Sequence, residues 1–227
     1  MQARQQAGQF EVPDRGGNRF VRHTGLAAPF MYDNVSTDVP GPPAEASGLD
    51  KLGMTSQAEL AFANIRYNPD GTEKPDFVFN QEPYRRASIM IVGLNYGTGS
   101  SRSSAITRPL AAWGVKAYIG ESFGPIFVTN ALQYGVVTVQ LPRATVDRIA
   151  AWVRANPGVE MTVDLQRQVV ELPGQQPIPF QYNPRFRNKL LNGLDDMEEM
   201  EPHLVTAASK REEDVRQRPW VYNYHNR

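Results

Sequence analysis

Apolar residues gather in short runs along the middle of the chain, and turn residues separate these runs. The clearest run is Ile89-Met90-Ile91-Val92 within residues 87–93, and its continuous apolar character is typical of a strand covered on both faces. Shorter runs and alternating patterns predict further strands at residues 20–29, 76–80, 115–119, 126–128, 136–139, 161–165, 168–172 and 179–182.

Two other segments show the spacing of amphipathic helices. Between residues 144 and 155 the apolar positions recur three or four residues apart, and the pattern ends at Asn156-Pro157-Gly158. A second helix is expected at residues 184–192, because Asn183 suits the N-cap and Pro184 suits the first helical position.

The two ends of the chain differ from its middle. Residues 1–19 mix Gln, Arg and Gly with few apolar positions. Such a segment buries too little apolar surface to offset the loss of conformational entropy on ordering, so we expect a flexible N-terminal arm. Residues 38–56, rich in Pro, Gly and small polar residues, are expected to form a loop. One domain is therefore predicted at residues 20–196, followed by a C-terminal extension at 197–227 whose aromatic residues suggest docking onto a partner.

Composition excludes several classes of function. The chain has 24 basic and 24 acidic residues, so no long-range field favours nucleic acid or an anionic membrane. It has no cysteine, which excludes disulfides, thiolate catalysis and an iron-sulphur cluster held by this chain's own thiolates. No apolar run approaches the length of a membrane helix or signal peptide, so a cytoplasmic protein is expected. His23, His203 and His225 share no ligand spacing, so we expect no metal site on this chain.

The segment with the most unusual backbone chemistry follows the clearest strand. Within residues 95–105, Gly97 and Gly99 allow sharp turning and leave their amides unshielded, and the serines after them can cap a helix. A helix start beside Arg102 favours a carboxylate or phosphate, so the segment is a candidate anion-binding loop. The simpler alternative is a helix-capping turn with a solvated arginine. Spacing alone does not decide between them, because the third dinucleotide glycine and a P-loop lysine are both absent.

The same segment resembles a known family. The run Asn95-Tyr96-Gly97-Thr98-Gly99-Ser100-Ser101-Arg102 is similar to the glycine, serine, serine, arginine signature of the swivelling domain of the aconitase superfamily. Further segments, in the same order, resemble the bacterial 3-isopropylmalate dehydratase small subunits; they lie at residues 20–29, 34–38, 75–80 and 187–195. The resemblance implies a swivelling β/β/α-type domain of the α/β class, with a mixed sheet core and flanking helices, and it places the anion-binding loop at the carboxyl end of a strand.

The resemblance also implies an activity. Such small subunits work with a large subunit that carries a four-iron four-sulphur cluster, and the pair is a hydro-lyase that removes water from a hydroxy dicarboxylate and returns it at the adjacent carbon. By position, Ser100 would exchange the proton at that carbon, and Ser101 and Arg102 would bind a substrate carboxylate together with Thr98 and Gly99. The simplest expectation is the small subunit of 3-isopropylmalate dehydratase in leucine biosynthesis, with no nucleic acid, membrane or metal bound by this chain.

Some positions depart from the family pattern. Ser103 and Ser104 stand where the family usually has Glu-His, Thr98 stands where many small subunits have Cys, and Ser36 replaces an expected Asp. Residues 44–53, which in the family contact the variable side group of the substrate, lack the usual arginine-threonine-glycine pattern. Two alternatives therefore stay open: a related citraconate, maleate or dimethylmaleate type hydratase, and a non-catalytic carboxylate-binding or scaffold module.

Overall fold

The computed structural model describes residues 19–43, 48–99 and 102–222 of the chain. By its internal contacts the chain divides into two compact units, residues 1–193 and residues 194–227. The first unit contains the sheet and the candidate anion-binding loop, and each unit is described by itself below.

Among the described residues, the strands form one seven-stranded sheet in the order β4-β3-β2-β1-β5-β6-β7. The strands are β1 (Arg22–Phe30), β2 (Ile89–Val92), β3 (Ala117–Gly120), β4 (Val137–Gln140), β5 (Glu160–Asp164), β6 (Val169–Glu171) and β7 (Ile178–Pro179). Strands β1 to β4 run parallel, whereas β5 to β7 pair antiparallel. The sheet is therefore mixed, as the resemblance implies.

Strand β1 joins the two halves of this sheet. Its first residues, 22–26, pair with β5, and its last residues, 27–30, pair with the clearest predicted strand, β2. Gly25 lies near this division, and a Cβ atom at that position would be 2.2 Å from Ser88 Oγ. A side chain at this position would therefore displace the Ser88 hydroxyl, which lies just before β2 and is 2.7 Å from His23 Nε2.

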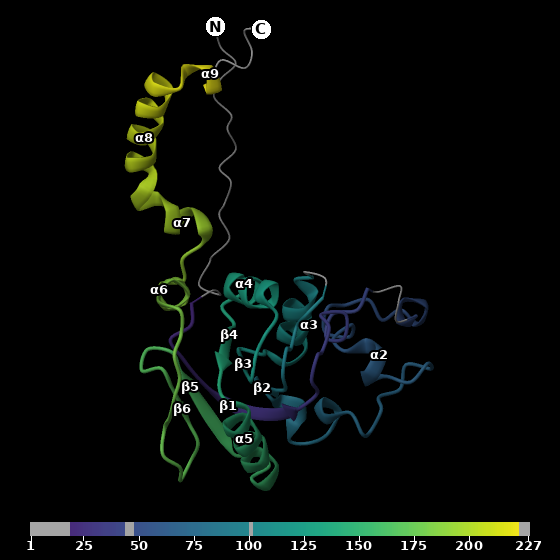
Figure 1. Ribbon diagram of the computed structural model, residues 1–227. Helices are drawn as coiled ribbons and strands as arrows, with labels where there is room; N and C mark the ends of the chain where they lie inside the picture. Colours follow the sequence, from purple (N-terminus) through teal and green to yellow (C-terminus); the bar gives the residue numbers. More distant parts are fainter. Residues whose placement is uncertain (1–18, 44–47, 100–101, 223–227) are drawn as a thin grey trace, which may run out of the picture. The chain divides into compact units, whose positions relative to one another are not determined.

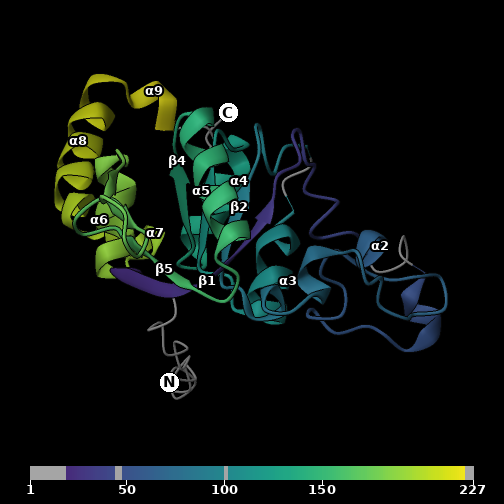
Figure 2. The same cartoon turned by 90° about the horizontal axis from the view of Figure 1, so that it is seen from below.

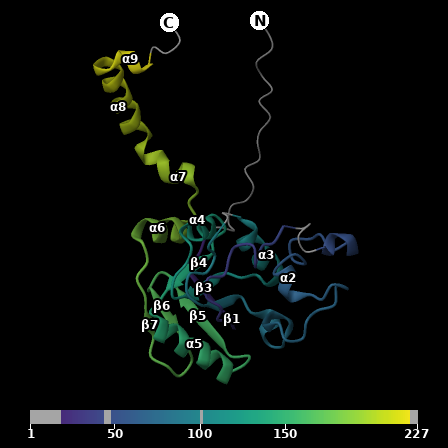
Figure 3. The ribbon, with the colours of Figure 1, turned by 45° about the vertical axis from the view of Figure 1, so that its right-hand side comes forward.

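Helices cover both faces of the sheet (Figure 1), and Figure 3 shows α4 and α5 on opposite sides. They are α3 (Ser104–Trp113), α4 (Pro125–Gln133), α5 (Arg143–Ala155) and α6 (Pro184–Asn192). One buried cluster joins the sheet to α5 and includes Ile89, Ile91, Ile119, Val146 and Ile149. A second cluster joins the other face to α3 and α4 and includes Met90, Val92, Tyr118, Ile106 and Phe127. Adjacent residues of β2 alternate between these clusters, because side chains of a strand point to opposite faces.

Most of the predicted elements are present, and both predicted helices are confirmed. Helix α5 spans the predicted segment, and α6 begins with Pro184 after Asn183, whose side chain accepts hydrogen bonds from the backbone of Arg185 and Phe186. Two predicted strands are wrong. Residues 126–128 lie inside α4, which buries Phe127, and residues 76–80 contain the short 3-10 helix η3 (Val78–Asn80).

A long segment between β1 and β2 packs beside α3, where Figure 2 shows it as the blue ribbon. Its short helices are η2 (Leu49–Leu52), α2 (Ala63–Arg66), η3 and η4 (Tyr84–Arg86). Phe62, Phe77 and Phe79 from this segment are buried in the cluster shared with α3. Aromatic anchors therefore help to hold this segment against the domain.

The second unit consists of α7 (Asp196–Met200), η5 (Glu201–His203), α8 (Leu204–Gln217) and α9 (Pro219–Tyr222). Helix α7 begins with a capping box formed by Asp195 and Glu198. No residue of these four helices is buried. Across the part of the chain that the structure describes, no helix is both long and apolar enough to cross a lipid bilayer.

Candidate functional site

The predicted anion-binding loop lies at the edge of the sheet where the parallel strands end. The loop after β1 runs alongside it, and an isolated parallel bridge pairs Ser36 with Thr98. The Gly97 amide donates to the carbonyl of Val35 at 2.8 Å, and the Thr37 amide donates to the carbonyl of Thr98 at 2.8 Å. Backbone hydrogen bonds therefore fix the glycine loop to a segment about sixty residues earlier in the chain.

The loop after β3 holds the other side of the glycine loop. Tyr96 and Phe123 form a second isolated parallel bridge. The Tyr96 amide donates to the carbonyl of Ser122 at 3.0 Å, and the Gly124 amide donates to the carbonyl of Tyr96 at 2.8 Å. Three successive strand ends thus converge on this loop, as expected at the carboxyl edge of a parallel sheet.

Close contacts explain why glycines occupy this loop. Gly97 has φ of 75°, and a Cβ atom there would lie 2.4 Å from the ring of Phe127. Gly99 has φ of 92°, and its added Cβ would lie 2.9 Å from Ser36 Oγ. At Gly124 an added Cβ would lie 2.4 Å from the carbonyl oxygen of Gly97. Positive φ therefore favours glycine at Gly97 and Gly99, and close contacts leave no room for a side chain at Gly97 and Gly124.

Arg102 lies two residues before Ser104, the first residue of helix α3. Its Nε atom forms an ion pair with Asp38 Oδ1 at 3.0 Å, and both side chains are about half exposed. Asp38 is itself held in a local turn, because its amide donates to Ser36 Oγ at 3.2 Å. The loop after β1 thus holds the guanidinium beside the glycine loop while leaving it accessible to solvent.

The start of α3 is tied to the segment that follows Asp38. Ser104 Oγ donates to the carbonyl of Gly41 at 3.0 Å, and the buried Arg108 donates to the carbonyl of Pro42. Ser103 precedes the helix, but its side chain makes no capping hydrogen bond. Ser103 therefore does not cap α3 through its side chain. Instead, the side chains of Ser104 and Arg108 bind the helix to residues 41–42.

The predicted site residues fall into two groups. The structure brings Thr98, Gly99 and Arg102 together at one edge of the sheet. Ser100 and Ser101 lie outside the described residues, so their roles stay predictions. The sequence analysis missed Asp38 as the partner of Arg102. Asp38 lies in the segment 34–38, which resembles the family and pairs with the glycine loop through Ser36 and Thr98. This resemblance could have indicated Asp38 as a site residue.

A second ion-pair cluster supports the same edge of the sheet. Arg143, at the start of α5, donates from Nη1 to Asp33 Oδ1 at 2.9 Å and lies 3.5 Å from Glu121 Oε2. Asp33 Oδ1 also accepts the Leu94 amide at 2.8 Å. The Leu94 hydrogen bond and the Arg143 guanidinium together lower the pKa of Asp33. Arg143 therefore links the strand-end loops around the site.

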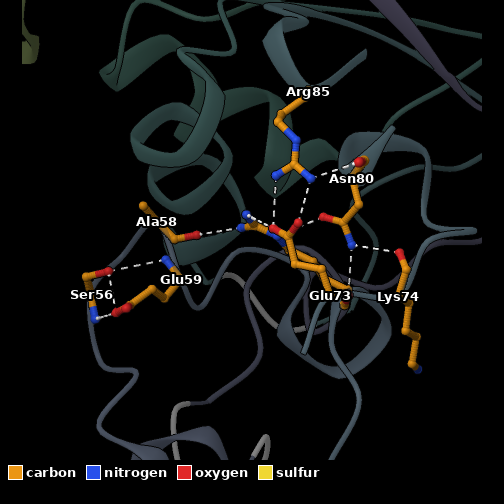
Figure 4. A network of polar contacts seen from close by, with 8 residues as sticks. Ser56, Ala58, Glu59, Glu73, Lys74, Asn80 and Arg85 are labelled. Carbon is orange, nitrogen blue, oxygen red and sulfur yellow. Dashed lines mark hydrogen bonds and ion pairs between the residues drawn. The ribbon is translucent and has the colours of Figure 1, made fainter. Parts of the chain in front are cut away.

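A third polar network holds the long segment between β1 and β2 (Figure 4). Arg66 donates to Asn80 Oδ1 at 3.3 Å and to Glu73 Oε1 at 3.2 Å, and its guanidinium lies 4.8 Å from the centre of the Trp113 ring. Arg85 Nη1 donates to the same Glu73 oxygen at 3.1 Å. These bonds, with Arg85 first, lower the pKa of Glu73. Because Trp113 ends α3, the network connects this segment to the helix that starts at the candidate site.

Comparison with known proteins agrees with this geometry. The family described as "Aconitase C-terminal domain" matches residues 17–144, and the family described as "LeuD_N" matches residues 147–181. The 3-isopropylmalate dehydratase small subunit of Gluconobacter oxydans is 40% identical over 192 residues, which are 85% of this chain and 90% of that protein. The protein of the same name from Paracoccus denitrificans is 34% identical over 204 residues, 90% of this chain and 100% of its own.

A solved structure shows the same fold. The crystal structure of 3-isopropylmalate dehydratase (leuD) from Methanocaldococcus jannaschii superposes with a TM-score of 0.55 at 22% identity, covering 83% of this chain and 99% of that one. The mixed sheet, its flanking helices and the glycine loop at the carboxyl edge define an α/β domain of the aconitase C-terminal type. More narrowly, the chain belongs to the family of 3-isopropylmalate dehydratase small subunits. The predicted family and fold class are both confirmed.

Proposed function

We propose that this chain is the small subunit of a heteromeric hydro-lyase that interconverts 3-isopropylmalate and 2-isopropylmalate by dehydration and rehydration, a step of leucine biosynthesis. The observation that carries the proposal is the similarity, over 85% to 90% of the chain, to relatives named as this small subunit. The exposed arginine beside the glycine loop supports it, because the substrate is a dianion that needs a cationic partner.

The reaction requires a partner subunit. A four-iron four-sulphur cluster needs thiolate ligands, and this chain has no cysteine, so the cluster would be carried by the large subunit. When bound, such a cluster supplies Lewis-acid assistance at the substrate hydroxyl. The residues of this chain would provide substrate binding, orientation and proton transfer.

Arg102 would bind a substrate carboxylate. A guanidinium carries five N–H donors in one plane, so the contact of Nε with Asp38 is compatible with a second, bidentate contact to a ligand. Asp38 would then orient the guanidinium toward the substrate. The turn at Thr98 and Gly99 would let the carboxylate approach the backbone closely.

Ser100 would act as the base and acid at the carbon next to the departing hydroxyl. A serine hydroxyl is a poor base unless its alkoxide is stabilised. The start of α3 and the Arg102 guanidinium, two residues away in the chain, both favour negative charge in this position. The proton would pass between Ser100 Oγ and the substrate carbon, and Ser101 would help to hold the carboxylate.

The test is the Ser100→Ala variant, assayed in the complex with the large subunit. Loss of the base should lower kcat by at least about 100-fold, with KM changed much less. Ser209→Ala is a matched control, because Ser209 lies on the exposed surface of α8. If Ser100→Ala keeps near-normal turnover, Ser100 is not the base.

A smaller substrate is the second candidate. The loop at residues 44–53 departs from the family pattern. Within its described part, Leu49 is buried in a small cluster with Leu60, Ala63 and Tyr67, which belong to the same long segment between β1 and β2. The complex should therefore be assayed with isopropylmalate, citraconate, maleate and dimethylmaleate. A strong preference for the smaller acids would favour a related hydratase over the leucine pathway.

The third candidate is a carboxylate-binding or scaffold module without turnover. It predicts that carboxylates bind the isolated chain and that no cluster-bearing large subunit co-purifies with it. Recovery of such a partner in a pull-down, together with turnover, would exclude this candidate.

A further inference from the structure

The second unit of the chain exposes apolar side chains that no core covers. Among the described residues, eight of the fourteen exposed large apolar side chains lie in this unit, although it contributes only residues 194–222. They are Met197, Met200, Leu204, Val205, Val215, Trp220, Val221 and Tyr222. No residue of its four helices is buried, and helices of this length are only marginally stable in water without packing. The unit therefore needs a further surface to stabilise it.

Four of these residues form a patch at the start of the unit. Met197, Met200 and Leu204 recur three and four residues apart, the spacing that places side chains on one face of a helix. Val205 follows directly, and the four side chains, termed the methionine patch below, are 54% to 79% exposed. Unbranched methionine side chains adapt well to a partner surface. A cluster of this kind is typical of an interaction site.

Acidic residues alternate with the methionines of the patch. Between residues 195 and 201 the chain has five carboxylates and no basic residue. A symmetric pair of copies would bring the patch against itself, because a two-fold interface uses the same surface on both partners. The two sets of carboxylates would then repel each other. A second copy of this chain therefore does not suit the patch, whereas an apolar surface with a basic edge does.

The methionine patch is not part of the candidate site. The two family matches end at residue 181, and the predicted site residues all lie at 98–102. The proposed reaction nevertheless requires a second polypeptide, because this chain has no cysteine to hold an iron-sulphur cluster. That polypeptide is the one partner that the proposed function demands.

We propose that the methionine patch is a docking surface for the large subunit, which covers it with an apolar groove edged by lysine or arginine side chains. The inference rests on the proposed function for the identity of the partner. It goes beyond that function because it assigns part of the subunit interface to residues 197–205. The patch would bind as the apolar face of a helix binds a groove, and the carboxylates beside it would speed association with a basic surface.

The first test measures the affinity of the two subunits. The double variant Met200→Gln, Leu204→Gln removes apolar surface and keeps good helix-forming residues. With the full chain and the purified large subunit, its Kd should be at least about tenfold above that of wild type. The concentration of small subunit that gives half-maximal turnover should rise by the same factor. An unchanged Kd would overturn the proposal.

The matched control is Lys210→Gln, on the same helix. Lys210 lies six residues after Leu204 and therefore on another side of α8, so the Kd should stay within about twofold of wild type. Glu201→Lys tests the charge of the partner. It should raise the Kd, and the Kd of wild type should rise as sodium chloride is increased from about 50 to 500 mM. A Kd that responds neither to Glu201→Lys nor to salt would overturn the basic edge.

Measurements on the isolated chain test the other occupants. If sedimentation shows a dimer that the double variant dissociates, a second copy covers the patch and the proposal is wrong. If the double variant lowers the urea midpoint of the isolated chain, the patch packs within the chain and the proposal is also wrong. If the large subunit binds through the patch but the complex does not turn over isopropylmalate, the proposed function fails and the docking surface stands.

Discussion

Alanine in place of Gly97 would test the central feature of the site, a glycine turn packed directly on an aromatic core. Gly97 has φ of 75°, and a side chain in that conformation costs about 1–2 kcal/mol. Its added Cβ would also lie 2.4 Å from the ring of Phe127, a residue that is 1% exposed. Overpacking of this kind typically costs about 1–3 kcal/mol. The free energy of unfolding should therefore fall by about 2–5 kcal/mol.

Two other glycines separate these contributions. Gly114 has φ of 67° and no atom within 4 Å of an added Cβ, so Gly114→Ala reports the backbone cost alone, about 1–2 kcal/mol. At Gly99 the nearest atom is Ser36 Oγ at 2.9 Å, the end of a side chain that can rotate away. We therefore expect the loss of stability to rank Gly97→Ala first, then Gly99→Ala, then Gly114→Ala.

Urea unfolding of the full chain, followed by circular dichroism, measures these differences. With a slope of about 1–3 kcal/mol per molar urea, the midpoint of Gly97→Ala should lie about 1 M below that of Gly114→Ala. If the two variants unfold at the same urea concentration, the packing of Gly97 against Phe127 contributes nothing. The turn would then be set by its backbone conformation alone.

Three further predictions concern other parts of the first unit. Tyr118 is fully buried, and its hydroxyl has no hydrogen-bond partner among the described residues, so Tyr118→Phe should leave the urea midpoint unchanged or raise it. Glu73→Gln should lower the free energy of unfolding by about 1–3 kcal/mol, because Arg66 and Arg85 lose their shared carboxylate; an unchanged midpoint would contradict this role. Burial, with Coulombic repulsion from a nearby lysine, lowers the pKa of His23. The folded state thus binds a proton at His23 less readily than the unfolded state does. The free energy of unfolding should therefore be independent of this group above pH about 6.5 and should fall as the pH drops below that value. Melting temperatures of wild type and His23→Gln should converge between pH 8 and 5; a constant gap would refute the pKa direction.

The sequence predicted the elements whose pattern is long or continuous. The apolar run at 89–92 was sufficient to predict strand β2, because burial on both faces leaves a continuous apolar pattern. The spacing at 144–155 was sufficient to predict helix α5, because apolar residues recur with a period of 3.6 residues. The error at residues 126–128 has the opposite cause, since three apolar residues suit a strand or a helix equally. Pro125 at the first helical position was the available signal.

The candidate site could be predicted only in part. The glycines and Arg102 were visible in the sequence because they lie within one short loop. Asp38, Asp33 and Arg143 were not, because they come from other loops and meet only through the strand order β4-β3-β2-β1. The spacing of residues along the chain does not show which strand ends become neighbours. These partners can therefore be identified only once the order of the strands in the sheet is known.

The backbone bonding of the site also explains why the departures from the family pattern leave the fold intact. Ser36 replaces an aspartate, yet its hydroxyl accepts the Asp38 amide, as a carboxylate in that position would. Thr98 contributes its carbonyl to the Thr37 amide, a bond independent of its side chain. Ser104, which stands where the resemblance leads us to expect a histidine, tethers α3 to Gly41. Ser36, Thr98 and Ser104 thus each form a hydrogen bond that positions the glycine loop or the start of α3, so the structure gives no reason for these three differences to disturb the loop.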